Sequence, residues 1–345
     1  MLRTAIEEAF AIQAGHCTRM GSPFTAQLCR RVPRLLDEST ATGRAVRDWA
    51  LDPVDSALAL RVCGALHRLV RLGTVPDLAR CYPPEADLGE ALDGALVGAI
   101  AAQDEALLAL LATPPQTNEI GRAGALIGAL MRVSRETGLP LSLWEIGASA
   151  GLNLHLDAYA YDFGAQSYRP EGAPLTVACA WRGAAPEIVP VHVTARRACD
   201  AAPRNPGDAH DRETLLAFVW ADQEARMART MAALTHAAST GVVPEQADAA
   251  EWVEARLAEA AEPGVARVLM HSIMWQYLDA TRQARIETAM ARAGETATRE
   301  TPLAWARLER DATPGSAALL LTCWPGATTR VLARADFHGA WVEWL

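Results

Sequence analysis

The sequence contains no lysine, because all 32 basic residues among its 345 are arginines. Enzymes that form Schiff bases, including those that use pyridoxal phosphate, need a lysine amine, and protein kinases and P-loop nucleotidases need one to hold a phosphate. The absence of lysine therefore excludes these classes. Asparagine is also scarce and occurs only at positions 118, 153 and 205. A residue type that the composition suppresses is most informative where it persists.

Signals for metal binding, secretion and membrane insertion are also missing. The seven cysteines form no C-x-x-C pair, and the eight histidines show no zinc-ligand spacing. The amino terminus, MLRTAIEEAF, has no apolar core of a signal peptide, and no apolar run approaches the 18 to 20 residues or so that span a bilayer. A formal net charge of −9 disfavours nucleic-acid binding. We expect a cytoplasmic protein with no metal and no membrane or nucleic-acid partner.

The first third of the chain is predicted to be helical. Apolar residues repeat at helical spacing from Leu58 to Leu69 and from Leu92 to Leu111, and prolines fall between such stretches. No segment before residue 113 has the pattern of a strand. We therefore predict an all-helical cap domain over residues 1–112.

The hydrophobic period changes after Pro140, where a short apolar run, Leu141–Ile146, precedes a glycine-rich turn and an amphipathic stretch from Leu152 to Tyr159. This order predicts strand, tight turn and helix. Further buried strands are predicted at 175–180, 188–194, 265–270, 303–308, 317–323 and 329–333, with helices at 212–237, 249–261 and 279–293.

Alternating strands and helices predict an α/β domain over residues 113–345, with a mostly parallel sheet covered on both faces. Only Trp324–Ala327 joins the last two strands, so we expect them to form an antiparallel C-terminal hairpin. A segment rich in glycine, proline and aromatics, at about 161–187, is interpreted as an inserted hairpin.

The most informative stretch is the turn after the first strand, Glu145-Ile-Gly147-Ala-Ser149-Ala-Gly151. As acid-x-G-x-small-x-G, it lets the backbone approach a ligand, and the following helix offers free N–H groups to an anion. As G-x-S-x-G, it matches the nucleophile elbow of serine hydrolases. Asp311 and His338 come in the order that a hydrolase needs, but no oxyanion-hole glycine cluster precedes the turn, and an elbow does not account for Glu145. A structural turn without a ligand is the third interpretation.

The turn resembles motif I of the Rossmann-like S-adenosylmethionine-dependent methyltransferases. The wider sequence resembles an uncharacterised bacterial family, domain-of-unknown-function family 2332. The stretches that carry this resemblance are Gln116–Arg122, Glu145–Asn153, Asp200 with Pro203, Val219–Gln223 with Arg226, and His338–Trp341. The resemblance implies a Rossmann-like fold with bound S-adenosylmethionine.

The resemblance also implies acids at the ends of the next strands. Asp200 corresponds to the acid that binds the ribose hydroxyls, although it follows Gly151 by almost fifty residues where about 20 is usual. Asp248 corresponds to the acid that faces the adenine amino group, and an ordinary helix cap is the alternative. Ser149 departs from the motif, because it adds a side chain where the cofactor comes closest.

Residues 116–119 precede a helix that runs to about Thr137 and then leads into the first strand. At about 1.5 Å per residue this helix exceeds the length of the strand, so its amino end reaches the carboxyl edge of the sheet, where α/β folds bind ligands. We expect Asn118, Glu119 and Arg122 to meet Asn153 there. Arg122 is a candidate clamp for the cofactor carboxylate, with a solvent-exposed arginine as the alternative, and helix capping is the alternative for Asn118.

His271 follows the fourth strand at the same edge and is the candidate general base, with a structural role as the alternative. The resemblance thus implies methyl transfer to a small or peptide-like acceptor. Two alternatives remain, a non-catalytic protein that binds a nucleotide-like ligand on the same fold and a serine hydrolase that uses Ser149.

Overall fold

The computed structural model describes residues 2–84 and 89–345, and the chain divides into two compact units. The first unit comprises Met1–Thr117 and His210–Ala228, and the second comprises Asn118–Ala209 and Arg229–Leu345. The chain therefore passes between the units three times. The second unit carries every candidate site residue named above.

The first unit is helical, as the apolar spacing predicts. Its core consists of buried leucines and aromatics such as Phe10, Phe24 and Leu66. No single helix among the described residues is long and apolar enough to cross a membrane, and only the pair α6 (Glu90–Ala102) and α7 (Asp104–Leu111), bent by 86°, reaches that length and apolarity together. Its helices up to Thr117 are α1 (Leu2–Arg19), α2 (Pro23–Leu35), α3 (Ala41–Arg47), α4 (Leu58–Arg71), α5 (Pro76–Ala79), α6 (Glu90–Ala102) and α7 (Asp104–Leu111).

The later segment His210–Ala228 completes this unit through specific contacts. The Asp222 carboxylate accepts hydrogen bonds from the Ser22 hydroxyl and, at 2.8 Å, from the Phe24 N–H, so it caps α2. Arg71 forms a two-pronged ion pair with Glu213, at 2.8 and 3.0 Å. The helix predicted at 212–237 is interrupted here, giving α9 (Ala209–Ala217) and α10 (Glu224–Thr240).

The second unit is an α/β domain built on a nine-stranded sheet in the order β5-β12-β11-β10-β9-β8-β1-β6-β7. Strands β7, β6, β1, β8 and β9 are parallel, and β9 to β12 are antiparallel neighbours. This confirms the mostly parallel sheet and its C-terminal hairpin. The nine strands are β1 (Leu141–Ile146), β5 (Ala180–Arg182), β6 (Val193–Asp200), β7 (Glu245–Gln246), β8 (Ala266–Ser272), β9 (Leu303–Arg310), β10 (Ala317–Trp324), β11 (Thr328–Ala335) and β12 (Trp341–Trp344).

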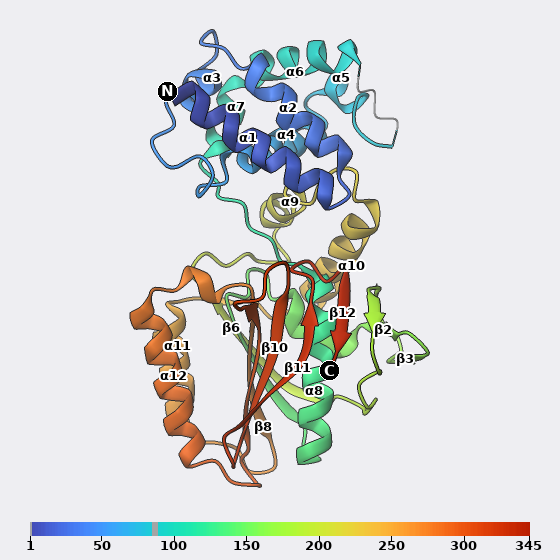
Figure 1. Ribbon diagram of the computed structural model, residues 1–345, viewed down its shortest axis with the longest axis vertical. Coiled ribbons are helices and arrows are strands. Elements are labelled where there is room, and N and C mark those ends of the chain that lie inside the picture. The colour runs from blue at the N-terminus through green and yellow to red at the C-terminus, as the bar shows by residue number, and fades with distance from the viewer. Residues whose placement is uncertain (1, 85–88) are drawn as a thin grey trace. The chain divides into compact units, whose positions relative to one another are not determined.

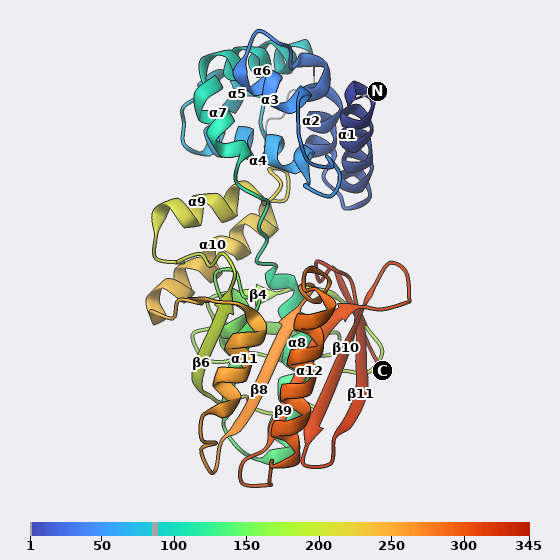
Figure 2. The ribbon, with the colours of Figure 1, turned by 90° about the vertical axis from the view of Figure 1, so that its left-hand side faces the viewer.

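Helices cover both faces of this sheet. Figures 1 and 2 show α11 (Ala249–Ala258) and α12 (Ala280–Glu295) on one face and α8 (Ala123–Thr137) on the other. Trp144, Ile146 and Trp305 point toward the first pair and form a buried cluster with Ile286 and Met290. Because strand side chains alternate, Glu145 points to the opposite face.

Two further segments differ from the sequence prediction. The strand predicted at 188–194 begins five residues later, because Pro190 cannot donate to a ladder and the paired residues include the polar Arg196 and Arg197. The amphipathic helix predicted from Leu152 to Tyr159 is instead a 3-10 helix, η2 (Leu152–Ala158), whose first five residues are all buried.

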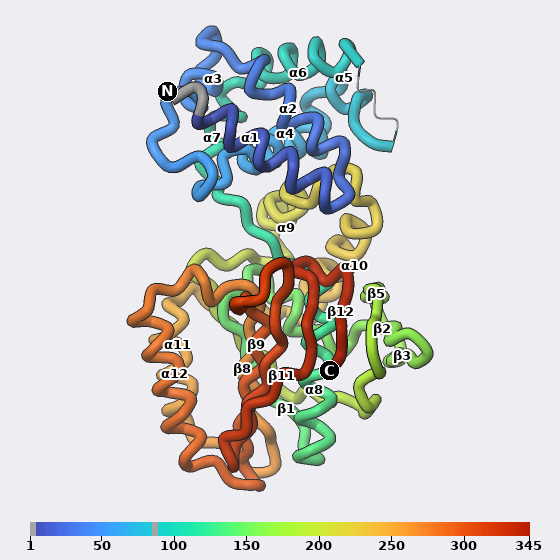
Figure 3. Tube along the Cα trace, viewed as in Figure 1, coloured from blue at the N-terminus to red at the C-terminus, as the bar shows by residue number. Residues whose placement is uncertain are grey.

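The inserted hairpin near 161–187 is present as β2 (Ala160–Phe163) and β3 (Gln166–Tyr168), with β4 (Thr176–Val177) alongside β2. The short strand β5 follows this hairpin in the chain and pairs with β12 at the edge of the large sheet (Figure 3). The insertion therefore also extends the main sheet, which its composition did not predict.

Candidate functional site

The backbone of the turn after β1 adopts the left-handed conformation, which favours glycine, at three alternating positions. The φ angles are +65° at Gly147, +57° at Ser149 and +71° at Gly151. A Cβ on Gly147 would also lie 2.9 Å from the Cβ and Cγ of Met274, so both backbone conformation and packing require glycine there. Ser149 adopts a glycine-like conformation at the middle position of the motif.

Protein acceptors take up every backbone N–H from residue 148 to residue 152. The Asn118 Oδ1 accepts from Ala150 at 3.2 Å and from Leu152 at 3.0 Å. The Asp200 Oδ2 accepts from Ser149 at 2.8 Å. The two remaining amides, of residues 148 and 151, donate to backbone carbonyls. The expectation that this turn offers free N–H groups to an anion is therefore wrong, because Asn118 and Asp200 already cap it.

Buried acceptor atoms without donors surround the same turn. Within the described residues, Glu145 Oε2, Ser149 Oγ and Asn153 Oδ1 are buried and have no hydrogen-bond partner. Burial raises the pKa of the Glu145 carboxyl well above its ordinary value of 4.5, and the Asp200 charge raises it further, whereas Arg122 and Asn153 lower it. A buried polar atom without a partner is costly. The site therefore suits a ligand that donates hydrogen bonds or carries positive charge.

The stretch Asn118–Arg122 reaches this turn, as the length of α8 predicts. Glu119 caps the 3-10 turn η1 (Ile120–Arg122) by accepting the Gly121 N–H at 3.0 Å, and its carbonyl accepts from Asn153 Nδ2 at 3.4 Å. Asn118 and Asn153 thus lie at one turn. A Cβ on Gly121 would lie 2.1 Å from the His338 carbonyl oxygen, so two of the stretches that carry the family resemblance pack directly on each other.

Arg122 connects the end of β8 with a loop at the carboxyl edge of the sheet. Its Nε donates to the Phe337 carbonyl at 2.9 Å, and its Nη1 donates to the Ser272 carbonyl at 3.2 Å. The guanidinium also lowers the pKa of the buried Glu145. Arg122 therefore holds the end of β8 and the loop after β11, and it supplies positive charge near Glu145.

Asp200 lies at the end of β6, next to the glycine turn. Its Oδ1 accepts the Ala202 N–H at 2.8 Å, while Oδ2 accepts the Ser149 N–H. A carboxylate oxygen has two lone pairs, so each of these atoms keeps one for a further donor. The spacing of almost fifty residues from Gly151 is spanned by η2 and the inserted hairpin.

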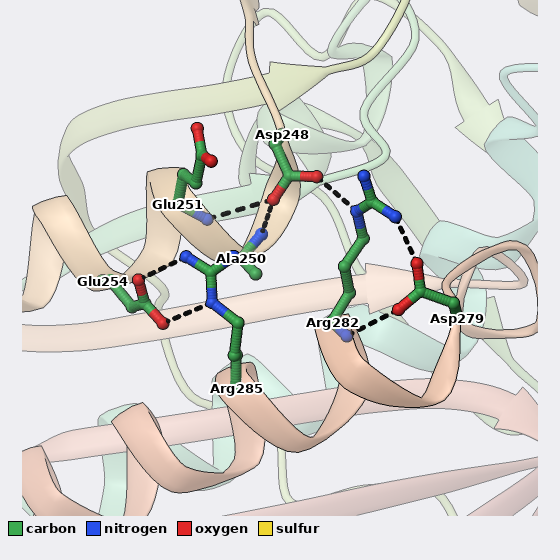
Figure 4. Close-up of polar contacts among 7 residues, drawn as sticks. All are labelled: Asp248, Ala250, Glu251, Glu254, Asp279, Arg282 and Arg285. Atoms are coloured by element: carbon green, nitrogen blue, oxygen red, sulfur yellow. Dashed lines mark hydrogen bonds and ion pairs between the residues drawn. The ribbon is translucent and has the colours of Figure 1, made fainter.

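Asp248 lies at the start of α11 (Figure 4), directly after Ala247, whose N–H donates to the Asp200 carbonyl. Its Oδ1 accepts the N–H groups of Ala250 and Glu251 at 3.0 and 3.2 Å, and its Oδ2 pairs with Arg282 at 2.5 Å. These contacts hold the pKa of the carboxyl below its usual value even though burial raises it. This is the geometry of a helix cap with an ion pair.

His271 is completely buried on β8 and faces the side of the sheet opposite to Glu145. Its Nδ1 lies 2.6 Å from Glu309 Oε1 on β9. The indole of Trp275 stacks on the imidazole, with ring centroids 5.0 Å apart and an interplanar angle of 13°. The structure thus gives His271 a carboxylate partner that the sequence analysis did not identify.

The hydrolase interpretation requires a hydrogen bond between Ser149 and a histidine, which the described residues do not form. The Ser149 hydroxyl has no hydrogen-bond partner among the described residues, so no imidazole activates it. Asp311 binds Arg334 with both carboxylate oxygens, at 2.8 and 2.9 Å. Only the left-handed conformation of Ser149 agrees with a nucleophile elbow.

Two further residues at this edge were missed. Glu309 lies just beyond the apolar run 303–308, where a single buried acid was the available signal. Met274 covers Gly147 and follows Ile273, a β-branched residue with a φ of +50°. Backbone strain of this kind leaves no sequence signature but often occurs at ligand sites.

The chain matches a protein-family model described as "Uncharacterized protein conserved in bacteria (DUF2332)" over residues 7–344, and it belongs to that family. The resemblance carried by the five sequence stretches is thereby confirmed. No curated protein and no solved structure matches the chain.

Proposed function

We propose that this protein is an S-adenosylmethionine-dependent methyltransferase that acts on a small or peptide-like acceptor. The observation that carries the proposal is the turn after β1, where Asp200 from the neighbouring strand binds the middle residue of acid-x-G-x-S-x-G. The cofactor brings a methyl group on a positively charged sulfonium, so no lysine is needed.

The sheet order supports a Rossmann-like site. Taken in chain order, the parallel strands β1, β6, β7, β8 and β9 have the spatial order 3-2-1-4-5, as in dinucleotide-binding folds. In that order, ligands bind where the strand order reverses, which here is between β1 and β8. The glycine turn and His271 belong to these two strands.

The polar groups fit the cofactor's charge. The unpartnered oxygens of Glu145, Ser149 and Asn153 would accept from its ammonium group, and Asp200 would accept from its ribose hydroxyls. We assign the cofactor's carboxylate to Arg122, the cation that lowers the pKa of Glu145. Because Asn118 and Asp200 already occupy the turn's N–H groups, the site favours this cationic ligand over a nucleotide held by its phosphates.

Calorimetry with S-adenosylmethionine and S-adenosylhomocysteine tests the proposal. We expect binding of both by the wild-type chain and a loss of about 10-fold or more in Asp200→Asn, because a hydrogen bond to a charged group contributes about 1.5 to 3 kcal/mol. The matched control is Asp279→Asn, which keeps a capping oxygen at the start of α12 and is expected to bind as the wild type does.

A folded wild-type chain that releases no heat with either compound would contradict the proposal. Binding without turnover over a broad acceptor panel would favour a non-catalytic ligand-binding protein on the same fold. Labelling of Ser149 by a fluorophosphonate, with no cofactor binding, would favour a hydrolase.

A further inference from the structure

His271 and Glu309 form a buried pair whose hydrogen position follows from the neighbouring contacts. The Glu309 Oε1 accepts the backbone N–H of Met274 at 3.1 Å and also lies 2.6 Å from His271 Nδ1. A carboxylate oxygen accepts hydrogen bonds, so the ring nitrogen that faces it, Nδ1, carries the imidazole hydrogen. The second ring nitrogen, Nε2, then carries a lone pair.

That lone pair has no donor in the part of the chain that the structure describes. His271 Nε2 is buried and unpartnered, although the ring is fixed by Glu309 on one edge and by Trp275 on one face. A base held in one orientation, with an open acceptor atom and a carboxylate behind it, has the arrangement of a general base and its positioning residue.

We propose that Glu309 is a positioning residue that keeps His271 as the Nδ1–H tautomer, so that Nε2 takes a proton from a hydroxyl-bearing acceptor. This inference rests on the proposed methyl-transfer function. In the proton transfer the acceptor's O–H bond breaks, its electron pair stays on oxygen, and an N–H bond forms at Nε2. The imidazolium that results is stabilised by the Glu309 carboxylate.

The chemistry of the base identifies the acceptor class. A neutral amine already has a free lone pair, and a thiol with a pKa of about 8.5 ionises readily near neutral pH. A phenol, with a pKa of about 10, stays protonated there, and an aliphatic hydroxyl does so more strongly. A dedicated base is therefore most useful for a hydroxyl, and we assign the acceptor to this class.

Nitrogen NMR of the full-length chain labelled with ¹⁵N-histidine tests the pair without any turnover. His271 is assigned by comparison with His271→Gln. We expect a protonated Nδ1 and an unprotonated Nε2 in the wild type, and a shift toward the opposite tautomer in Glu309→Gln. An Nε2–H tautomer in the wild type, or an unchanged spectrum in Glu309→Gln, overturns the proposal.

Turnover of matched hydroxyl and amine panels tests the acceptor class. We expect Glu309→Gln to lower kcat on hydroxyl compounds by about 10²-fold, the lower range for general base catalysis, and to change kcat on amines by less than 2-fold. Glu343→Gln, which alters an exposed carboxylate on β12, is the control and should change neither. Equal losses on both panels, or methylation of no hydroxyl compound, overturn the assignment.

The two proposals fail in different ways. Calorimetry on wild type and on Glu309→Gln is expected to show equal cofactor affinity, because Glu309 is assigned no cofactor contact. No binding by the wild type would overturn the methyltransferase itself. Normal binding with an unchanged His271 tautomer in Glu309→Gln would overturn the His271–Glu309 pair alone.

Discussion

Ser149 combines two unfavourable features in one residue. Its φ of +57° lies in the left-handed region, which costs a non-glycine residue about 1 to 2 kcal/mol. Its hydroxyl is buried and has no hydrogen-bond partner among the described residues. A residue that is unfavourable in both backbone and side chain is typical of a functional position.

Ser149→Gly is therefore expected to stabilise the fold. Relief of the left-handed strain outweighs the added flexibility of the unfolded chain, so we expect a net gain of about 0.5 to 1 kcal/mol in the free energy of unfolding. Urea denaturation measures it. Ser149→Ala is the control, since it removes the hydroxyl but keeps the Cβ and the strain. An equal gain in stability in Ser149→Ala and Ser149→Gly would show that removal of the hydroxyl, and not relief of backbone strain, is responsible.

Glu145 makes stability depend on pH in a defined direction. Its folded pKa is raised well above 4.5 by burial, so between these two pKa values the folded chain binds a proton that the unfolded chain has released. The free energy of unfolding then falls as pH rises, by up to about 1.4 kcal/mol per pH unit for this group, and the loss is complete above the folded pKa.

We expect Glu145→Gln to remove this pH-dependent loss. Its stability relative to the wild type should increase as pH rises from about 4.5, as measured by urea denaturation at a series of pH values. Glu262→Gln, an exposed carboxylate in the loop before β8, provides the comparison. A constant difference between Glu145→Gln and the wild type at all pH values would contradict the raised pKa.

At the scale of elements, one side chain from the start of η1 completes the connection between β1 and η2. Asn118 Oδ1 accepts both the Ala150 and the Leu152 N–H, as a helix cap does, but from a position more than thirty residues earlier in the chain. The geometry of the candidate site therefore depends on a contact between distant segments.

Asn118→Ala should lower the free energy of unfolding by about 1 to 2 kcal/mol, because two buried N–H groups lose their acceptor. Asn118→Asp keeps the accepting oxygen and is expected to retain most of the stability. Chemical denaturation of both variants tests the idea. If Asn118→Asp is as destabilising as Asn118→Ala, capping does not explain the contribution of Asn118 to stability.

The elements that the sequence predicted are those with local signals. Leu141–Ile146 and the glycines after it were identified by an apolar run and by turn residues, and β10 with β11 by the short connection between them. The polar strand β6 was misplaced because Arg196 is held by Asp157 and the Leu154 carbonyl, contacts that no local pattern encodes. Glu309 was missed for the same reason, since its partner His271 lies on another strand.

At the scale of the whole molecule, the first unit needs a segment that lies far along the chain. His210–Ala228 supplies the cap of α2, the partner of Arg71 and a carbonyl for His67. It also supplies Phe218, whose ring would lie 2.6 Å from a Cβ on Gly64. Residues 1–117 alone therefore lack part of their own core.

We expect a fragment of residues 1–117 to unfold without cooperativity. Joining 210–228 to it through a flexible glycine-serine linker should restore a cooperative thermal transition, which circular dichroism would record. The matched control is the same fusion, with a linker of equal length, in which the added segment carries Asp222→Ala and Glu213→Ala. A cooperative transition in residues 1–117 alone would show that the added segment is dispensable.

The three passages of the chain between units have a consequence for synthesis. A helical unit at the amino end could ordinarily fold as soon as it leaves the ribosome, but this one must wait for about 110 further residues to be translated. At about 5 to 20 residues per second, the delay is roughly 5 to 20 s, long compared with the folding of a small helical domain. Throughout that interval the surface that Phe218 later covers lacks its native cover, so the order of translation delays the burial of part of this unit's core.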